Sequence, residues 1–168
     1  MILGKKVVVV MPAYNAERTI EKTWREVMAQ EVVDQVIVVD DGSQDATIAL
    51  ARNLDKVLVH VHPKNRGYGG NQKTCYRLAL ENGADIVVMV HPDYQYTPKL
   101  IPAMAGLVAS GLYPCVLGSR ILGGQSANLT FAAHAISGRF SESRTHKACG
   151  FDGRVRKTAA VKTYLLFF

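Results

Sequence analysis

The stretch KVVVVMPAYNAERTIEKTWREVMAQ (Lys6–Gln30) decides the fold, because it joins a β-branched run to an amphipathic segment. We expect a strand over Lys6–Met11 that ends at Pro12, since valine favours strands and proline interrupts them. The apolar residues of the following segment recur at helical spacing, and they are Ile20, Trp24, Val27 and Met28. This spacing predicts a helix over Ala16–Gln30.

The same alternation of strand and helix continues along the chain. Further strands are expected at Gln35–Val39, Lys56–Val61, Asp85–Val90 and Pro114–Leu117. Further helices are expected at Asp45–Asn53, Tyr68–Asn82 and Pro98–Ser110. Short runs rich in Val and Ile are typical of parallel strands that are buried on both faces. The sequence therefore predicts an α/β fold in which helices cover a mostly parallel central sheet.

Composition favours a single globular domain without membrane spans. The chain has 168 residues and is 48% hydrophobic, which is enough for one core. It contains no apolar run long enough for a bilayer, and its N-terminus lacks a secretion signal, so we expect a cytoplasmic location. The net charge is +6, and residues 125–168 carry most of it, with 7 Lys or Arg against 2 Asp or Glu. No dense basic run is present, so a nucleic-acid partner is not expected.

Polar residues follow several of the predicted strands at the point where each strand ends. They are the loop from Pro12 to Glu17, the Asp40–Asp41 pair, the segment from His91 to Tyr96, and Gly118 to Arg120. Ligands of open parallel sheets bind beyond the carboxyl ends of the strands. The shared placement therefore predicts one binding site.

Asp93 and Gln95 have the spacing of a site for a hard divalent cation. Oxygen donors on a turn can hold Mg²⁺ while leaving coordination positions for phosphate and water. The alternative is an ordinary turn, because Asp beside Pro92 suits a turn without any ligand. His60, His62 and His91 lack the spacing of a zinc site, and the three cysteines form no CxxC pair.

The remaining candidate residues also have two interpretations. Asp40 and Asp41 would repel each other unless a donor such as a ribose or base N–H shares them. The alternative is that Ser43 or Asp41 caps the next helix, with Gly42 making the turn. Tyr14 could stack on a nucleobase and Glu17 could accept from its edge, but Glu17 also suits a helix first turn. Arg120 could clamp a phosphate or be a surface arginine. The glycine-rich segment Asn65–Asn71 fits no nucleotide-binding fingerprint.

Five segments resemble glycosyltransferase family 2, which has the GT-A fold. They are VVVVMPAYNAE (Val7–Glu17), VIVVDDGSQDAT (Val36–Thr47), NRGYGGNQKT (Asn65–Thr74), ADIVVMVHPDYQY (Ala84–Tyr96) and VLGSR (Val116–Arg120). They occur in the family's order and spacing. The branch that they resemble most is that of the dolichyl- and polyprenyl-phosphate sugar synthases. The resemblance implies a Rossmann-like layered sandwich that binds a UDP- or GDP-linked sugar.

The resemblance also implies roles for individual residues and an inverting sugar transfer. Pro12, Tyr14 and Glu17 would line the nucleoside pocket, and Asp40 or Asp41 would contact the base or ribose. Asp93, helped by Gln95, would meet Mg²⁺ or Mn²⁺ and the diphosphate, which Arg120 would also approach. The implied acceptor is a polyprenyl phosphate or a cell-envelope glycan, which places the protein in peripheral contact with the inner face of the membrane.

Two features depart from the family pattern. His91 occupies the first acidic position of the metal-binding signature, and a neutral imidazole is a poor ligand for Mg²⁺. Residues 125–168 show none of the family's acceptor-binding motifs. We therefore expect a nucleotide-sugar-binding domain at residues 1–124 and a truncated or divergent, poorly ordered tail at 125–168. The alternative to a working transferase is a fragment that binds the nucleotide sugar without transferring it.

Overall fold

The computed structural model describes residues 1–95, 97–119, 132–135 and 163–167. Its strands are β1 (Val7–Ala13), β2 (Gln35–Asp40), β3 (Val57–Val61), β4 (Ile86–Met89), β5 (Cys115–Ser119), β6 (Ala132–Ala135) and β7 (Thr163–Phe167). Its helices are α1 (Ile20–Met28), α2 (Thr47–Arg52), α3 (Gly67–Glu81) and α4 (Ile101–Ala109), and the short 3₁₀ helix η1 (Pro98–Leu100) precedes α4.

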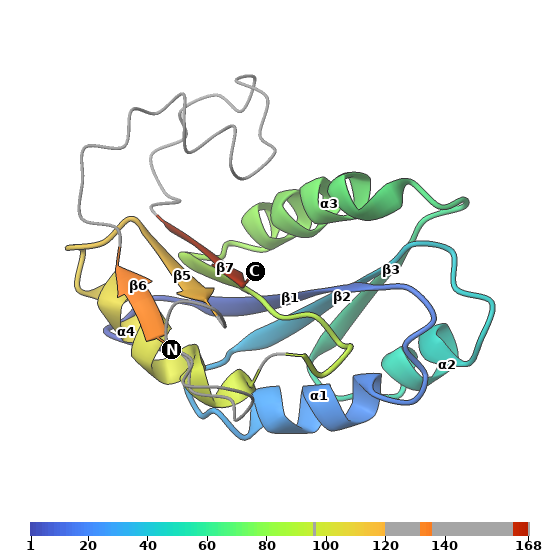
Figure 1. Ribbon diagram of the computed structural model, residues 1–168, viewed down its shortest axis with the longest axis horizontal. Helices are drawn as coiled ribbons and strands as arrows, with labels where there is room; N and C mark the ends of the chain where they lie inside the picture. The colour runs from blue at the N-terminus through green and yellow to red at the C-terminus, as the bar shows by residue number, and fades with distance from the viewer. Residues whose placement is uncertain (96, 120–131, 136–162, 168) are drawn as a thin grey trace.

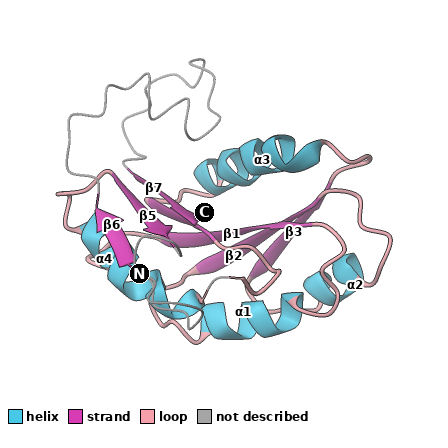
Figure 2. Ribbon diagram, in the orientation of Figure 1, coloured by secondary structure: helices cyan, strands magenta, loops and turns pink. Residues whose placement is uncertain are grey.

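The strands form one sheet in the order β3-β2-β1-β4-β7-β5-β6 (Figure 1). Every neighbouring pair is parallel except β5 and β6, which are antiparallel. Helix α3 covers one face of the sheet, and α1, α2 and α4 lie on the other (Figure 2). The predicted α/β fold with a mostly parallel sheet is therefore confirmed.

The valine run of β1 does not alternate with polar residues, because both faces of this strand are buried. Val7 and Val9 pack into the cluster that contains residues of α1 and α4. Val8 and Val10 pack into a second cluster with Cys75, Tyr76 and Ala79 of α3. All four valines are fully buried, because helices cover both faces of this central strand.

The strand β1 continues through Pro12 to Ala13, so the expectation that it ends at Pro12 was wrong. Val10 accepts a hydrogen bond from the backbone N–H of Val90, whereas Ala13 accepts one from Asp41 on the other side. Backbone groups alternate in direction along a strand, so Pro12 faces the same side as Val10. On that side β4 has already ended, so an N–H group at position 12 would have no strand partner, and proline is tolerated there.

The order of the strands reverses next to β1. The chain moves outward from β1 to β2 and β3, and then crosses back to place β4 on the other side of β1. This reversal is the point at which α/β sheets bind ligands, beyond the carboxyl ends of the two strands. Strands β6 and β7 come from the segment 125–168 and pair within the same sheet. A domain division at residue 124 stays a prediction.

Candidate functional site

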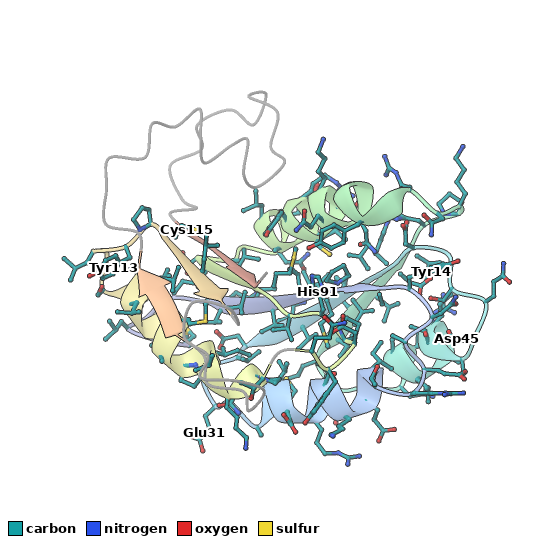
Figure 3. The ribbon with its side chains drawn as sticks, viewed as in Figure 1. Tyr14, Glu31, Asp45, His91, Tyr113 and Cys115 are labelled. Atoms are coloured by element: carbon teal, nitrogen blue, oxygen red, sulfur yellow. The ribbon has the colours of Figure 1, made fainter. Side chains whose placement is uncertain are left out.

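A cavity of about 440 Å³ lies at the carboxyl ends of β1 and β4. Its walls come from the loop after β1, the loop after β2, the first turn of α3 and the loop after β4. The residues that line it are Pro12, Tyr14, Asn15, Ala16, Glu17, Arg18, Thr19, Asp45, Tyr68, His91, Pro92 and Asp93. Figure 3 labels Tyr14, Asp45 and His91, which reach the cavity from three of these segments.

The structure brings together half of the predicted site residues at this cavity. Pro12, Tyr14, Glu17 and Asp93 line it, as the shared placement at strand ends predicts. Asp40, Asp41 and Gln95 are not among its lining residues. Arg120 lies outside the described residues. The individual roles of all these residues stay predictions.

The loops after β1 and β2 hold each other through reciprocal hydrogen bonds. The backbone N–H of Glu17 donates to Asp45 Oδ2 at 3.1 Å, and Glu17 Oε2 accepts from the N–H of Ala46 at 3.0 Å. The N–H of Asn15 donates to Ser43 Oγ at 2.8 Å. Glu17 therefore stabilises the start of α2 as well as lining the cavity. Glu17 does not lie in the first turn of its own helix, because α1 begins at Ile20. Its contact with a nucleobase stays a prediction.

Asp45 lines the cavity, although its place in the sequence predicted only the start of a helix. Burial alone would raise the pKa of its carboxyl, but hydrogen bonds from the side chain and N–H of Thr47 and from the N–H of Glu17 lower the pKa below 3.8. Asp45 therefore gives the cavity a carboxylate that stays charged under mildly acidic conditions.

Replacing Asp45 with asparagine is expected to reduce the free energy of unfolding at neutral pH by a small amount that depends on pH. The folded-state pKa is depressed, so the carboxylate stabilises the fold above its ordinary pKa of 3.8, and this stabilisation is lost as the pH falls through the folded-state value. Solvent screening keeps the effect small. Urea unfolding of both proteins, from neutral pH to below pH 3.8, measures this loss of stability. A difference that stays constant with pH would contradict the assignment.

Asp40 and Asp41 are buried, and each is held by its own set of donors. Asp40 Oδ1 accepts from the N–H groups of Gly42 at 3.0 Å and Ser43 at 2.8 Å, and Oδ2 accepts from the Ser43 hydroxyl. Gly42 has a φ of +83°, which a residue with a side chain rarely adopts. Asp40 thus fixes the turn that leads to α2.

Asp41 anchors the loop that precedes α3. Its Oδ1 lies 2.7 Å from His62 Nδ1 and accepts from the N–H of Arg66 at 2.8 Å. His62 Nε2 in turn lies 2.9 Å from Thr74 Oγ1 in α3. Asp41 and His62 are 3% and 2% exposed, so this network lies inside the protein and ties β2, β3 and α3 together.

The loop after β4 presents Asp93 and is attached to α1 through Tyr94. Asp93 is exposed, and its Oδ1 accepts from the N–H of Gln95 at 3.0 Å. Tyr94 has a φ of +62°, its hydroxyl donates to Glu26, and its ring lies 3.8 Å from Lys22 Nζ. The hydrogen bond to Glu26 raises the pKa of the Tyr94 hydroxyl. Helix α1 therefore holds the conformation of the loop that carries Asp93.

His91 lies where β4 meets the cavity and contacts Tyr68 of α3. Tyr68 Oη is 3.0 Å from His91 Nε2, and the two rings pack edge to face with centroids 5.4 Å apart. Burial lowers the pKa of His91, although the charge of Asp93 acts in the opposite direction. His91 is therefore a neutral imidazole at neutral pH.

The donors at this end of the cavity suit a cation that arrives with a phosphate ligand. Within the described part of the chain, no three His, Cys, Asp or Glu side chains are grouped closely enough to hold a metal. Mg²⁺ and similar cations often use one or two protein donors and complete their coordination with substrate phosphates and water. Asp93, with His91 beside it on the cavity wall, fits that arrangement.

Eight of the twelve residues that line the cavity were not predicted as ligands from the sequence, and Asp45, Tyr68 and His91 are among them. Asp45 follows the DDGS segment, Tyr68 belongs to the glycine-rich segment before Thr74, and His91 begins the polar segment that follows the fourth predicted strand. A usable signal existed for Asp45 and His91, because both follow predicted strands. Tyr68 reaches the cavity because the first turn of α3 lies against His91 in the loop after β4, which local sequence does not show.

Comparisons with known proteins identify the family of this chain. Residues 8–162 match the model of Glycosyl transferase family 2. UDP-N-acetylglucosamine–dolichyl-phosphate N-acetylglucosaminyltransferase from Methanococcus voltae is 31% identical over 133 residues, covering 70% of this chain and 53% of the relative. Undecaprenyl-phosphate mannosyltransferase from Micrococcus luteus is 30% identical over 137 residues, covering 79% of this chain and 56% of the relative. These relatives confirm the predicted branch.

Solved structures give the same family context. Glucosyl-3-phosphoglycerate synthase from Mycobacterium tuberculosis in complex with UDP superposes with a TM-score of 0.56 and 27% identity, covering 68% of this chain and 43% of that chain. The same enzyme with Mn²⁺, UDP and glucosyl-3-phosphoglycerate gives a TM-score of 0.55. The predicted GT-A fold is thereby confirmed. The chain spans about half the length of the two polyprenyl-phosphate relatives. By its match over residues 8–162, the chain belongs to glycosyl transferase family 2.

Proposed function

We propose that the chain binds a UDP- or GDP-linked sugar in the cavity beyond β1 and β4 and transfers the sugar to an acceptor with inversion. The observation that carries this proposal is the meeting of Tyr14, Glu17 and Asp93 in one cavity at the reversal of strand order. An exposed aromatic ring and a carboxylate from one loop line the same cavity as a second carboxylate from another loop. This arrangement suits the nucleoside at one end and the diphosphate at the other.

In this proposal, residues at different places along the cavity contact different parts of the nucleotide sugar. Tyr14, with 53% of its surface exposed, stacks on the base, while Pro12 and Glu17 shape the pocket around it. Asp93, with Gln95 beside it, faces the diphosphate. Bound Mg²⁺ or Mn²⁺ would neutralise the charge that develops on the leaving diphosphate. We propose that Arg120 approaches the same group.

The two buried acids support the cavity through the loops that they hold. The partners of Asp40 and Asp41 favour a role in shaping the turn before α2 and the loop before α3. Direct contact between one of these acids and the base or ribose, as the family resemblance implies, stays a prediction. Calorimetric titration of Asp41→Ala with UDP, beside its urea unfolding, tests this contact.

The acceptor that we propose is a polyprenyl phosphate at the inner face of the membrane. Support comes from the dolichyl-phosphate and undecaprenyl-phosphate named for the two relatives. A phosphate oxygen is already ionised, so it can attack the anomeric carbon without a strong general base. None of the helices in the described ranges has the length and apolar character that a bilayer crossing requires.

The proposal is tested by combining binding and transfer measurements on the same preparation. Calorimetry with UDP- and GDP-sugars is expected to show metal-dependent binding to one of them. Incubation with the radiolabelled form of that sugar and a polyprenyl phosphate is expected to yield a labelled lipid. Binding without transfer would identify a nucleotide-sugar-binding module instead, and absence of binding to either nucleotide would refute both functions.

Replacing Tyr14 with alanine is expected to weaken UDP binding by about tenfold, because stacking on an aromatic ring contributes about 1–3 kcal/mol per base. Replacing Tyr14 with phenylalanine keeps the ring and is the matched control, expected to bind as the original protein does. Calorimetric titration of both variants with UDP and Mn²⁺ measures the effect. Equal loss in both variants would place the contribution in the hydroxyl and contradict stacking.

A further inference from the structure

The turn after β4 carries a bulky residue at a position where turns usually have glycine or asparagine. Tyr94 has a φ of +62°, in the left-handed region, which costs free energy for a residue with a large side chain. Such a conformation persists only where the surrounding contacts hold it in place. Asp93 Oδ1 accepts from the N–H of Gln95 at 3.0 Å across this turn, so the orientation of the Asp93 carboxylate depends on the conformation of Tyr94.

Helix α1 supplies contacts that hold Tyr94 in this conformation. The Tyr94 hydroxyl donates to the carboxylate of Glu26, and Lys22 Nζ lies 3.8 Å from the centroid of the Tyr94 ring. Lys22 and Glu26 are four positions apart on the helix, so they lie on the same side of α1. The hydrogen bond to Glu26 raises the pKa of the Tyr94 hydroxyl, which therefore stays a donor at neutral pH.

The same helix connects the loops that form two walls of the cavity. Thr23 Oγ1 donates to the carbonyl of Pro92 at 3.4 Å, and Thr23 is fully buried. Together with the contacts of Tyr94, this bond attaches the loop to α1 on both sides of Asp93. The loop after β1, which carries Tyr14, runs directly into α1. A single rigid element therefore links the positions of Tyr14 and Asp93.

We propose that Tyr94 is a positioning residue, whose hydrogen bond to Glu26 fixes the Asp93 carboxylate in the orientation that binding of a nucleoside diphosphate requires. This inference rests on the proposed function. Tyr94 is not among the residues that line the cavity, so it acts through Asp93 and not on the ligand. A loop that is already ordered loses less conformational freedom when the ligand binds, so the hydrogen bond raises the affinity.

Hydrogen exchange of the whole chain without nucleotide tests whether the hydrogen bond orders the loop. The N–H of Gln95 is expected to exchange about tenfold faster in Tyr94→Phe and in Glu26→Ala, because the loop opens more often without this bond. Glu21→Ala is the matched control and is expected to leave this exchange unchanged. Glu21 belongs to the same helix, but its partner is the exposed Arg25, at 2.7 Å.

Calorimetric titration with UDP and with GDP, in the presence of Mn²⁺, tests the effect on binding. Tyr94→Phe and Glu26→Ala are each expected to weaken the affinity by about tenfold, and the double variant is expected to lose no more than either one, because both remove the same hydrogen bond. Glu26→Gln keeps an acceptor oxygen and is expected to recover most of the affinity. Adding Tyr94→Phe to Asp93→Ala is expected to have little further effect, since Tyr94 acts through Asp93. Circular dichroism of each variant establishes that it is folded.

The possible outcomes separate this inference from the proposed function. If the original protein and folded Tyr94→Phe bind the nucleotide equally well, the inference is overturned and the proposed function stands alone. Unchanged exchange of the Gln95 N–H, or an equal loss of affinity from Tyr94→Phe with and without Asp93, would overturn it in the same way. If the original protein binds neither UDP nor GDP, both proposals fail.

Discussion

Replacing Asp93 with alanine is expected to weaken UDP binding in the presence of Mn²⁺ by about 100-fold, which corresponds to about 2.7 kcal/mol. Asp93 is the carboxylate that the loop after β4 presents to the cavity, and its loss removes the negatively charged ligand proposed for the cation. Without added metal, the affinity for UDP is expected to change little. Calorimetric titrations with UDP, in the presence and absence of Mn²⁺, measure both values.

The fold is expected to tolerate this change. Asp93 is exposed, so the free energy of unfolding should change by no more than about 0.5 kcal/mol. Asp55→Ala is the matched control, because it removes an exposed acid just before β3, at the opposite end of the sheet. Equal affinities for UDP in Asp93→Ala and the original protein, with and without Mn²⁺, would show that Asp93 is not a ligand.

The fold was predictable because its central strands are hydrophobic along their whole length. Runs such as Val36–Val39 are fully buried on both faces, so they carry a strong signal for a parallel sheet. Helix α1 was predicted from Ala16 but begins at Ile20. The backbone N–H groups of Ala16 and Glu17 donate instead to the side chains of Thr47, at the start of α2, and Asp45, just before it, and local sequence does not show such distant partners.

The sequence predicted which strand ends would meet at the candidate site, but it did not predict the contacts of each side chain there. Parallel strands bring their carboxyl ends to one edge, so Tyr14 and Asp93 were expected to meet, and they line one cavity. The environment of each acid depends on residues far along the chain. Asp41 is held by His62 and Arg66, which are 21 and 25 positions away, and no spacing rule predicts those contacts.

The buried network around Asp41 has a consequence for how the cavity keeps its shape. The loop before α3 is attached through the N–H of Arg66 to Asp41, and the first turn of α3 carries Tyr68, which contacts His91. The position of the cavity wall therefore depends on a carboxylate that is itself out of reach of solvent. The stability of the fold and the binding of UDP are therefore coupled, although we expect Asp41 to contribute most to stability and Asp93 most to binding.

Replacing Asp41 with alanine is expected to lower the free energy of unfolding by about 3 kcal/mol. The substitution leaves the buried imidazole of His62 and the N–H of Arg66 without the oxygen that accepts from them, and the interior offers little water in exchange. Urea unfolding followed by circular dichroism measures the loss. Asp41→Asn, which keeps one acceptor oxygen in nearly the same volume, is expected to lose less stability.

The comparison with Asp93→Ala separates an anchoring acid from a binding acid. Asp41→Ala should lose stability, whereas Asp93→Ala should lose metal-dependent affinity for UDP and keep its stability. If Asp41→Ala unfolds at the same urea concentration as the original protein but no longer binds UDP, the buried network contributes little. Asp41 would then contact the nucleoside, as the family resemblance implies. When the substrate binds, the carboxylate of Asp41 would have to give up its contacts with His62 and Arg66.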